Sequence, residues 1–456
     1  MKIRLPLGLS IASGVPVLVL VSVGPVAALA GPASIVAWSG AAVIGLLMAF
    51  AFAELSASMP AVSGGIAALS AEVLGRRSRL LAMISQWSYW FGWSPTLAIS
   101  SALAAGYLQT AVIPHTPAWV GWLLAFAVLG LSGAINVGGI RLAGWVQLVL
   151  GACALIPVAV LAVLPWVTGQ VHPGNFVPFA PPGGWLSLGG LTAIAGGLFI
   201  AGWSAYGCEL ALTYSGEYRG GNRDAIRSLL TVGAVSVLVF TAVPLALIGV
   251  LGTSGAQADP SVALIPFAQR VTGYASAVVF GLLLVSLLLG VNMVMIGSSR
   301  LLRRMAESGY AWEALGRLNA QGAPRNATMF DVTANAVLLV AVLVLTRGQI
   351  TNAPIYLLAA ANVGYFVSIV LAQVAAYLQR REAPADPQVR FRAPAGLMGI
   401  GMVLAVLNVV LLVSAGFAWG WLNILLGLAC LVIVVGVLGR AFRSRRPVPA
   451  GAEGVA

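Results

Sequence analysis

The sequence has few charged residues and little of the chemistry on which most enzymes depend. Only 8% of its 456 residues are charged, and it contains two histidines and three cysteines. An ordinary soluble domain has about 25% charged residues. With 60% hydrophobic residues and a mean hydropathy of +0.98, the chain has too little polar surface for a soluble fold. The composition excludes a soluble protein and indicates an all-α integral membrane protein.

The scarce reactive residues do not form a catalytic or metal-binding pattern. Cys153, Cys208 and Cys430 all lie in apolar segments, so they indicate neither a disulfide framework nor a metal site. His115 and His172 lie beside prolines in expected outer loops, with no second ligand at a useful spacing. No Gly-rich loop ending in Gly-Lys-Ser/Thr occurs, which argues against an ATP-driven protein. We therefore expect no enzyme activity, no metal and no cofactor.

Lysine is almost absent, and the basic residues are nearly all arginines. The net charge is +12, and Lys2 is the only lysine among 24 basic residues. In a soluble chain this excess would suggest nucleic-acid binding. Here the arginines lie in short loops between apolar runs, where they anchor helices on the cytoplasmic side. Lys2 and Arg4 lead directly into an apolar run, so we expect a first helix that stays in the membrane rather than a cleaved signal.

Twelve apolar spans of roughly 20 residues or more predict twelve transmembrane helices. They lie at about residues 9–30, 33–58, 80–110, 118–138, 144–167, 188–215, 228–251, 276–302, 328–346, 352–378, 396–417 and 419–439. A cytoplasmic N-terminus places 22 of the 24 basic residues inside and leaves only Arg270 and Arg347 outside. We therefore expect a multi-pass protein of the cell membrane with both termini in the cytoplasm.

Two of the spans carry helix-breaking residues. The first contains Gly14 and Pro16, and the sixth contains Gly196, Gly197 and the run from Gly202 to Glu209. Glycine permits backbone angles that other residues resist, and proline removes a hydrogen-bond donor. One interpretation is that these glycines only allow close helix packing. The alternative is unwound backbone, which a bilayer tolerates only where it lines a cavity or is buried in protein.

The spacing of the two breaks favours unwound backbone. They fall five spans apart, and an odd number of spans per repeat inserts the second repeat upside down. Interrupted segments at matching places in two halves are typical of the central site of a transporter. Exposed amides and helix N-termini attract an anionic group, and free carbonyls attract a cation. A zwitterion such as an amino acid would satisfy both.

Several motifs together resemble the amino acid–polyamine–organocation permeases, over nearly the whole chain. The segments that carry the resemblance are ASGVP at 12–16, AGP at 30–32, AELSASMP at 53–60 with SGG at 63–65, the sixth span from 203 to 209 with GE at 216–217 and NRD at 222–224, and SR at 299–300 with MAESG at 305–309 and a proline at 324. Two departures concern the first helix, where Ala12 replaces the family's first glycine and Pro16 replaces a phenylalanine. A third concerns the fifth helix, which has Ala154 in the region where several proton-coupled relatives carry a lysine. That absence puts lysine-based proton coupling in doubt and leaves exchange or another coupling group.

The resemblance implies a five-plus-five inverted repeat (LeuT-like) with two additional C-terminal helices and with the first and sixth helices broken. It further implies alternating access around a site between those two helices. The chain would then divide into a cytoplasmic N-terminal tail (1–8), a first repeat (9–187), a second repeat (188–378), the eleventh and twelfth helices (379–440) and a cytoplasmic C-terminal tail (441–456).

The same resemblance implies the substrate-binding residues. Amides around Ala12, Ser13, Gly14 and Val15 would hold a substrate carboxylate. Carbonyls of the sixth helix would receive the ammonium group. The substrate-binding residues of that helix would be Gly202, Trp203, Ser204, Ala205, Tyr206 and Gly207, with Trp203 as an aromatic gate rather than a core residue.

Three acids lie within the apolar spans. We expect Glu54 and Asp331, near predicted cytoplasmic helix ends, to pair with nearby arginines. Glu209 lies deepest, where an ionisable group is expensive and indicates function. We expect it to be a fixed acid satisfied by backbone amides freed at the break, and the alternative is a coupling group that changes charge during transport.

The function that these expectations favour is secondary active transport of amino acids, with a small-molecule substrate and the lipid bilayer as partners. A polyamine or organic-amine permease is an alternative that would need more acids in the site. An amino acid exporter or exchanger would use the same parts. A channel or a membrane enzyme is a more distant alternative, against which the paired breaks and the missing histidines argue.

Overall fold

The structure is a computed structural model that describes residues 14–62, 64–215, 218, 220–273, 276–382 and 391–442. Within these ranges the chain is all-helical. Nine helical stretches there are long and apolar enough to cross a membrane, counting Val19–Ser58 as a single stretch of 40 residues. The all-α prediction is therefore confirmed for the described residues.

The described residues form a series of helices joined mostly by short turns, with longer connections at 168–187 and 308–324. The first are α2 (Gly14–Val17), α3 (Val19–Ala30), α4 (Ser34–Ser58), α5 (Gly65–Gly75), α6 (Arg79–Trp93), α7 (Thr96–Ala111), α8 (Ala118–Val137) and α9 (Ile140–Val167). They continue with α10 (Leu188–Ala205), the 3-10 helix η3 (Tyr206–Tyr214), α11 (Asn222–Ala258), α12 (Leu264–Thr272), α13 (Ser276–Glu307), the 3-10 helix η6 (Glu313–Gly316), α14 (Arg325–Leu345), α15 (Ala353–Glu382), α16 (Ala395–Trp419) and α17 (Trp421–Phe442).

One predicted span, 80–110, is divided in the structure into α6 and α7 at Ser94 and Pro95. Proline has no N–H, and its ring clashes with the carbonyl four residues earlier, so a helix that reaches Pro95 must bend or end. Hydropathy does not register this interruption because both halves are apolar. The division matters for the site because the last turns of α6 carry most of its polar contacts.

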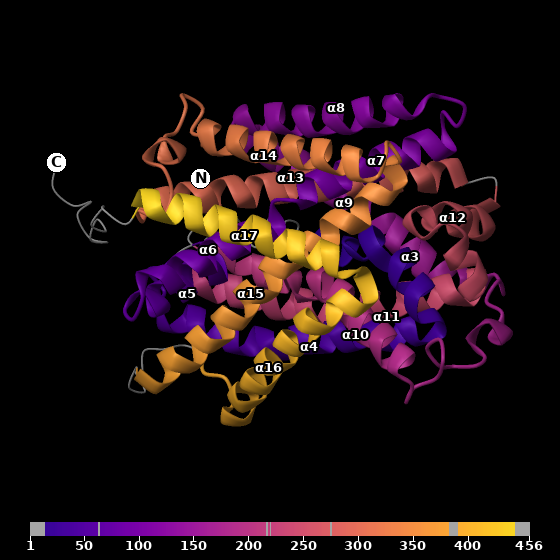
Figure 1. Cartoon of the computed structure of the whole chain (residues 1–456), viewed down its shortest axis with the longest axis horizontal. Coiled ribbons are helices and arrows are strands. Elements are labelled where there is room, and N and C mark those ends of the chain that lie inside the picture. Colours follow the sequence, from indigo (N-terminus) through magenta and orange to yellow (C-terminus); the bar gives the residue numbers. More distant parts are fainter. Residues whose placement is uncertain are drawn as a thin grey trace.

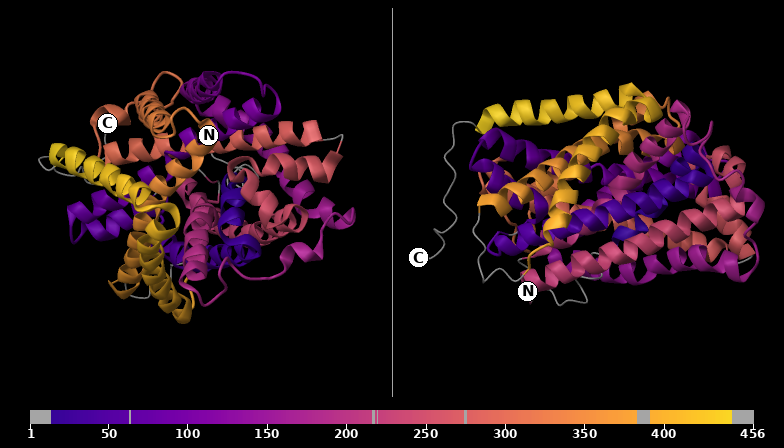
Figure 2. Two further views of the ribbon diagram at one scale, coloured as in Figure 1. Left: turned by 45° about the vertical axis from the view of Figure 1, so that its right-hand side comes forward. Right: turned by 90° about the horizontal axis from the view of Figure 1, so that it is seen from below.

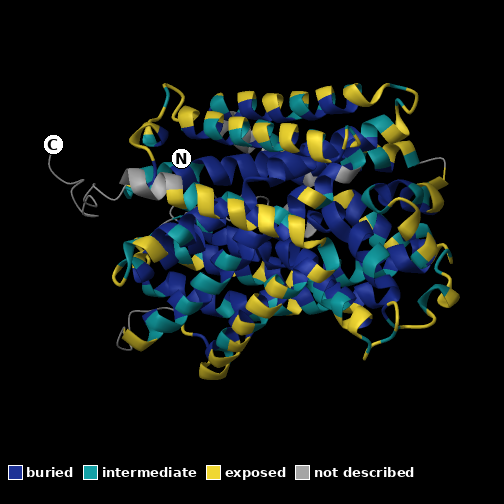
Figure 3. Cartoon of the chain, in the orientation of Figure 1, coloured by how far each residue is buried: buried dark blue, intermediate teal, exposed yellow. Residues whose placement is uncertain are grey.

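The bundle has a buried centre, and its exposed residues lie on the outer helices and loops (Figure 3). Helices α8 and α14 pack side by side at one edge, next to α13 (Figure 1). Helix α17 runs along the outside of the bundle, as Figure 2 shows. Outward-facing residues such as Val403 on α16 (67% exposed) and Leu422 on α17 (65% exposed) are large and apolar. In water such a surface would be unfavourable, whereas against lipid it costs nothing.

Helices α6 and α15 pack against each other in the centre with no room between their backbones. A Cβ atom added to Gly92 on α6 would lie 2.7 Å from Cα of Tyr365 on α15. A Cβ on Gly364 would lie 2.8 Å from the carbonyl oxygen of Ser88. Small residues of this kind let membrane helices approach closely. The contact fixes α6 relative to α15 beside the candidate site.

Candidate functional site

The first predicted helix is interrupted in the structure at Leu18. Helix α2 ends at Val17 and α3 begins at Val19. The Leu18 N–H donates to the carbonyl of Val15 (3.0 Å), and the Leu18 carbonyl accepts from Val21 N–H (3.1 Å). These contacts span three residues instead of four, so the chain is wound more tightly here than in an α-helix. Gly14 begins α2, and the predicted residues Ala12 and Ser13 lie outside the described residues.

The sixth predicted helix changes its winding at Tyr206 rather than at its glycines. Helix α10 continues through Ala205, and the 3-10 helix η3 follows. Gly197 and Gly202 lie inside the α-helix, where an added Cβ would come within 2.9 Å of Ala37 Cβ and 3.0 Å of Phe366 Cζ, respectively. These two glycines therefore permit close packing, and the interruption expected from Gly202 onward begins four residues later.

The two interruptions lie against each other. The Ser204 hydroxyl donates to the carbonyl of Leu18, the residue between α2 and α3 (3.2 Å). A Cβ added to Gly207 in η3 would lie 3.2 Å from Cγ1 of Val15 and 3.1 Å from Cη2 of Trp93. Three predicted site residues, Val15, Ser204 and Gly207, are thus brought together from segments almost 190 residues apart in sequence.

The other predicted residues of the sixth helix face different neighbours. The Tyr206 hydroxyl donates to Oδ1 of Asn408 on α16 (3.1 Å). Trp203 is completely buried, and its Nε1 donates to the carbonyl of Gly92 (2.9 Å). Its ring lies 5.3 Å from that of Trp93, centroid to centroid. In this structure Trp203 is packed onto α6, and its role as a gate stays a prediction.

Glu209 lies in η3 and is completely buried. Its Oε2 accepts a hydrogen bond from the Tyr89 hydroxyl (2.7 Å), and its Oε1 accepts from Trp93 Nε1 and the Tyr365 hydroxyl (3.2 Å each). Among the described residues its partners are three side chains from α6 and α15 rather than the expected backbone amides. Hydrogen bonds to an ionised carboxylate contribute about 1.5–3 kcal/mol each, roughly twice the neutral value.

Local sequence patterns indicate these three donors only in part. Tyr89 and Trp93 are four residues apart in the aromatic run 87–93, so they share a helix face. Nothing in the local pattern connects that face with Glu209 or with Tyr365, which is 156 residues further along the chain than Glu209. The helix breaks indicate Glu209 as a candidate site residue, but its hydrogen-bond donors depend on tertiary packing alone.

The predictions for the remaining two acids, Glu54 and Asp331, have different outcomes. Glu54 pairs with Arg380 (2.9 Å), so the expected structural ion pair is confirmed. Asp331 is completely buried, and the prediction that it pairs with an arginine is wrong. Arg325 begins the same helix, but it lies six residues before Asp331. Six residues of α-helix correspond to about 9 Å along the axis, so the two side chains are not neighbours. The partners of Asp331 are Trp90, Ser94 and Ser298, all bonded to its Oδ1.

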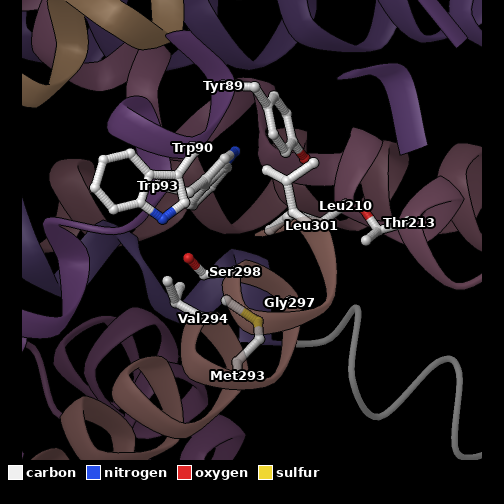
Figure 4. Close-up of a pocket in the computed structure, with 10 residues that line it drawn as sticks. All are labelled: Tyr89, Trp90, Trp93, Leu210, Thr213, Met293, Val294, Gly297, Ser298 and Leu301. Carbon is white, nitrogen blue, oxygen red and sulfur yellow. The ribbon is translucent and has the colours of Figure 1, made fainter. Parts of the chain in front are cut away.

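A cavity opens beside these residues between α6, η3 and α13 (Figure 4). The cavity is narrow, with a volume of about 20 Å³ open to the centre of a water-sized sphere. Tyr89, Trp90 and Trp93 of α6 lie opposite the α13 residues, as Figure 4 shows. The cavity is lined by Tyr89, Trp90, Trp93, Leu210, Thr213, Met293, Val294, Gly297, Ser298 and Leu301.

The fifth predicted helix corresponds to α9 and has no amine at the expected coupling position. Ala154 is completely buried, and its carbonyl accepts a hydrogen bond from Ser286 on α13 (3.2 Å). Among the described residues there is no group of three or more His, Cys, Asp or Glu side chains that could hold a metal ion. The chemistry of the region is thus that of buried acids, aromatic rings and hydroxyls.

Comparisons with known proteins agree on one family. A family model described as amino acid permease matches residues 8–440. The lysine-specific permease LysP of Escherichia coli (strain K12) is 28% identical over 310 residues, which is 62% of this chain and 60% of that permease. The branched-chain amino acid permease BcaP of Lactococcus lactis subsp. cremoris (strain MG1363) is 25% identical over 323 residues, 66% of this chain and 67% of that permease.

The amino-acid permease RocE of Bacillus subtilis (strain 168) is 27% identical over 255 residues, so the chain spans 51% of its length. A crystal structure of a manganese transporter of Eremococcus coleocola has the same fold, with a TM-score of 0.61 and 14% identity over 96% of this chain and 95% of that chain. The matched relatives are named as permeases rather than enzymes. The match across residues 8–440 and the long apolar helices show that the chain is a multi-pass membrane protein that belongs to the amino acid permease family.

Proposed function

We propose that the protein is a secondary active transporter that moves amino acids across the cell membrane by alternating access. The observation that carries the proposal is the contact between the two helix interruptions, where Ser204 donates to the Leu18 carbonyl and Gly207 lies against Val15. Interrupted helices that meet inside a membrane bundle are the usual binding site of secondary transporters. The permease names of the relatives support the same substrate class.

The substrate would lie between the α2–α3 junction and the α10–η3 junction. Its carboxylate would bind amides of Ala12, Ser13, Gly14 and Val15, because the N-terminus of a helix attracts an anion. Its ammonium would bind carbonyls near the end of α10, where the change to 3-10 winding leaves acceptors without an α-helical partner. Trp203 would cover the occupied site.

The surroundings favour an amino acid with an uncharged side chain. Val15, Trp93 and Gly207 present apolar surface to one another where the two junctions meet. Glu209, the acid nearest the break, already accepts three hydrogen bonds shared over both oxygens. It therefore has little capacity left for a second ammonium group, and this is why the polyamine alternative ranks lower.

The direction of transport follows from gradients rather than from the site. An importer, an exporter and an exchanger can share one alternating-access mechanism. Exchange is an alternative to coupled uptake in this protein because α9 has Ala154 where a coupling lysine would be expected.

We further propose the twelve-helix topology, with a first repeat at 9–187, a second at 188–378 and two further helices at 379–440. Reporter fusions test the cytoplasmic location of both termini. A reporter after Arg446 should be accessible only from the cytoplasm and a reporter in the loop 168–187 only from outside, because basic loops stay inside. A C-terminal tail reached from outside would contradict the topology and the inverted repeat.

The function itself is tested with the purified protein in proteoliposomes. Vesicles loaded with one amino acid should take up the same labelled amino acid from outside, and a panel of amino acids and polyamines should identify the substrate. We expect counterflow of at least one amino acid with an uncharged side chain. Counterflow of polyamines alone would contradict the proposed substrate class.

A further inference from the structure

Helix α6 binds two different buried acids with two neighbouring stripes of side chains. Tyr89 and Trp93 donate to Glu209 in η3. Trp90 and Ser94, each one residue further along, donate to Asp331 on α14. Residues four apart lie on one face of a helix, so each pair forms one stripe. The same helix therefore joins the predicted substrate site to a second carboxylate on the other side.

The two acids differ in how their oxygens are satisfied. Glu209 has hydrogen-bond donors on both oxygens. Asp331 has all three of its donors on Oδ1: Trp90 Nε1 (2.8 Å), the Ser94 hydroxyl (2.9 Å) and the Ser298 hydroxyl (2.8 Å). Its Oδ2 is buried and has no hydrogen-bond partner in the described part of the chain. An ionised carboxylate with a bare, buried oxygen is unfavourable, and a proton on that oxygen removes the cost.

No basic side chain supplies the missing charge by contact with Asp331 among the described residues. The elements packed against α14 include α7, α8, α13, α15 and η6, and α6 reaches it through hydrogen bonds. These elements and α14 itself carry the following charged or titratable side chains besides Asp331: Arg79 and Tyr89 (α6), Tyr107 (α7), Arg300, Arg303, Arg304 and Glu307 (α13), Glu313 (η6), Arg325 (α14), and Tyr356, Tyr365, Tyr377, Arg380, Arg381 and Glu382 (α15).

Several of these groups are bound to acids other than Asp331. Arg300 lies two residues beyond Ser298 on α13, and residues two apart do not share a helix face. Arg303 and Arg304 both pair with Glu307. Tyr89 and Tyr365 donate to Glu209. Within the described residues Asp331 is thus a buried acid without a bound countercharge, and an ionisable group that is so costly inside an apolar span indicates a function.

The cavity between α6, η3 and α13 lies beside the donors to this acid, although Asp331 itself is buried behind them. The lining of the cavity includes both Trp90 and Ser298, which are two of the three donors to Asp331. The donors belong to α6 and α13, whereas the carboxylate belongs to α14. Any movement of α6 or α13 relative to α14 would therefore change the donors around the carboxylate. A carboxylate that gains donors releases a proton more readily, so a rearrangement that brings a donor to Oδ2 would release the proton.

We propose that Asp331 is a proton-binding site that couples transport to a proton gradient, an inference that rests on the proposed transport function. A proton enters through the cavity and binds Oδ2 of Asp331, while Oδ1 keeps its donors. It leaves to the opposite side after the helices have moved, and the carboxylate returns to its ionised form. The protein thus has a coupling group on α14 in place of an amine on α9.

The test measures uptake into proteoliposomes with the amino acid that counterflow identifies. The wild type, Asp331→Asn and the matched control Glu307→Gln, which changes an exposed acid on α13, are compared with and without an inwardly directed proton gradient. We expect the gradient to raise accumulation several-fold in the wild type and in Glu307→Gln. Asp331→Asn should lose this rise while still showing counterflow, because asparagine has no titratable group.

Several results would overturn the proposal while leaving amino acid transport intact. These are a full response to the proton gradient in Asp331→Asn, a wild type that responds to a sodium gradient but not to protons, and a wild type with counterflow but no response to protons. A wild type without counterflow of any amino acid would instead contradict the transport function itself.

A second variant decides the question if Asp331→Asn does not fold. Ser298→Ala keeps the acid and removes one donor to Oδ1. The midpoint of the pH dependence of uptake should move to higher pH by about 0.5–1 unit, because the ionised form loses one hydrogen bond. A folded Ser298→Ala protein with the wild-type midpoint would overturn the proposal.

Discussion

Replacing Glu209 with glutamine removes a titratable group from η3, just after the α10–η3 junction, while preserving the shape of the side chain. Three donors converge on this carboxylate in the structure, and each has different freedom to adapt. The Tyr89 hydroxyl can rotate and accept a hydrogen bond from the new NH2 group, whereas the Trp93 indole can only donate. The glutamine oxygen should therefore face Trp93 and Tyr365, and its NH2 group should face Tyr89.

The expected loss of stability follows from this rearrangement. Each hydrogen bond to a charged acceptor contributes about 1.5–3 kcal/mol, and a neutral one about 0.5–1.5 kcal/mol. For an ionised Glu209, three bonds converted from the first kind to the second should lower the free energy of unfolding by about 3–4.5 kcal/mol, less the relaxation of the site and the burial cost that the removed charge no longer carries. Glu209→Ala should be more severe, because it leaves three buried donors without an acceptor, at about 1–3 kcal/mol each.

Two measurements on the purified protein test this prediction. Thermal unfolding in detergent should rank wild type above Glu209→Gln and Glu209→Ala lowest. Counterflow of an amino acid with an uncharged side chain should persist in Glu209→Gln with a pH dependence close to that of the wild type, because both oxygens of Glu209 are already satisfied. A flattened pH profile with surviving counterflow would refute the fixed-charge role and assign the coupling proton to Glu209.

Two further predictions concern helix packing around the site. Gly92→Ala should lower both the unfolding temperature and the transport rate, because the new Cβ would lie 2.7 Å from Cα of Tyr365 and overpacking costs about 1–3 kcal/mol. Gly106→Ala is the control, since its Cβ would meet only a methyl group of Thr351 at 3.7 Å; equal effects of the two variants would contradict the packing argument. Trp203→Ala should lower the free energy of unfolding by about 3–5 kcal/mol and weaken apparent substrate affinity roughly tenfold through lost cation–π attraction. Reduced stability with unchanged affinity would make Trp203 a core residue only.

The helices of this protein are largely predictable from its sequence because a bilayer requires long apolar runs. The expected span 118–138 corresponds to α8 (Ala118–Val137), and the expected start at 188 is the start of α10. Local helix geometry is less predictable. Pro95 divides α6 from α7 inside one apolar run, and the winding changes at Tyr206 instead of at Gly202. In both cases the break depends on backbone sterics and neighbouring packing, which hydropathy does not measure.

The site was predictable only as far as local pattern reaches. The broken segments and the depth of Glu209 could be recognised from glycine, proline and the position of the acid along its span. The donors to Glu209 could not, because Tyr89 and Tyr365 reach it from helices distant in sequence. The position of Asp331 near a basic loop predicts arginine partners, whereas hydroxyls and an indole bind it inside the bundle.

The most direct test of the account is an experimental structure of the protein with the amino acid that it transports. The substrate should lie between the α2–α3 junction and the α10–η3 junction. Its carboxylate should be within hydrogen-bond distance of amides of residues 12–15, and its ammonium group near carbonyls of residues 203–205. A substrate bound instead in the cavity beside Met293 and Ser298, away from Val15 and Ser204, would contradict the central claim that the paired helix interruptions form the binding site.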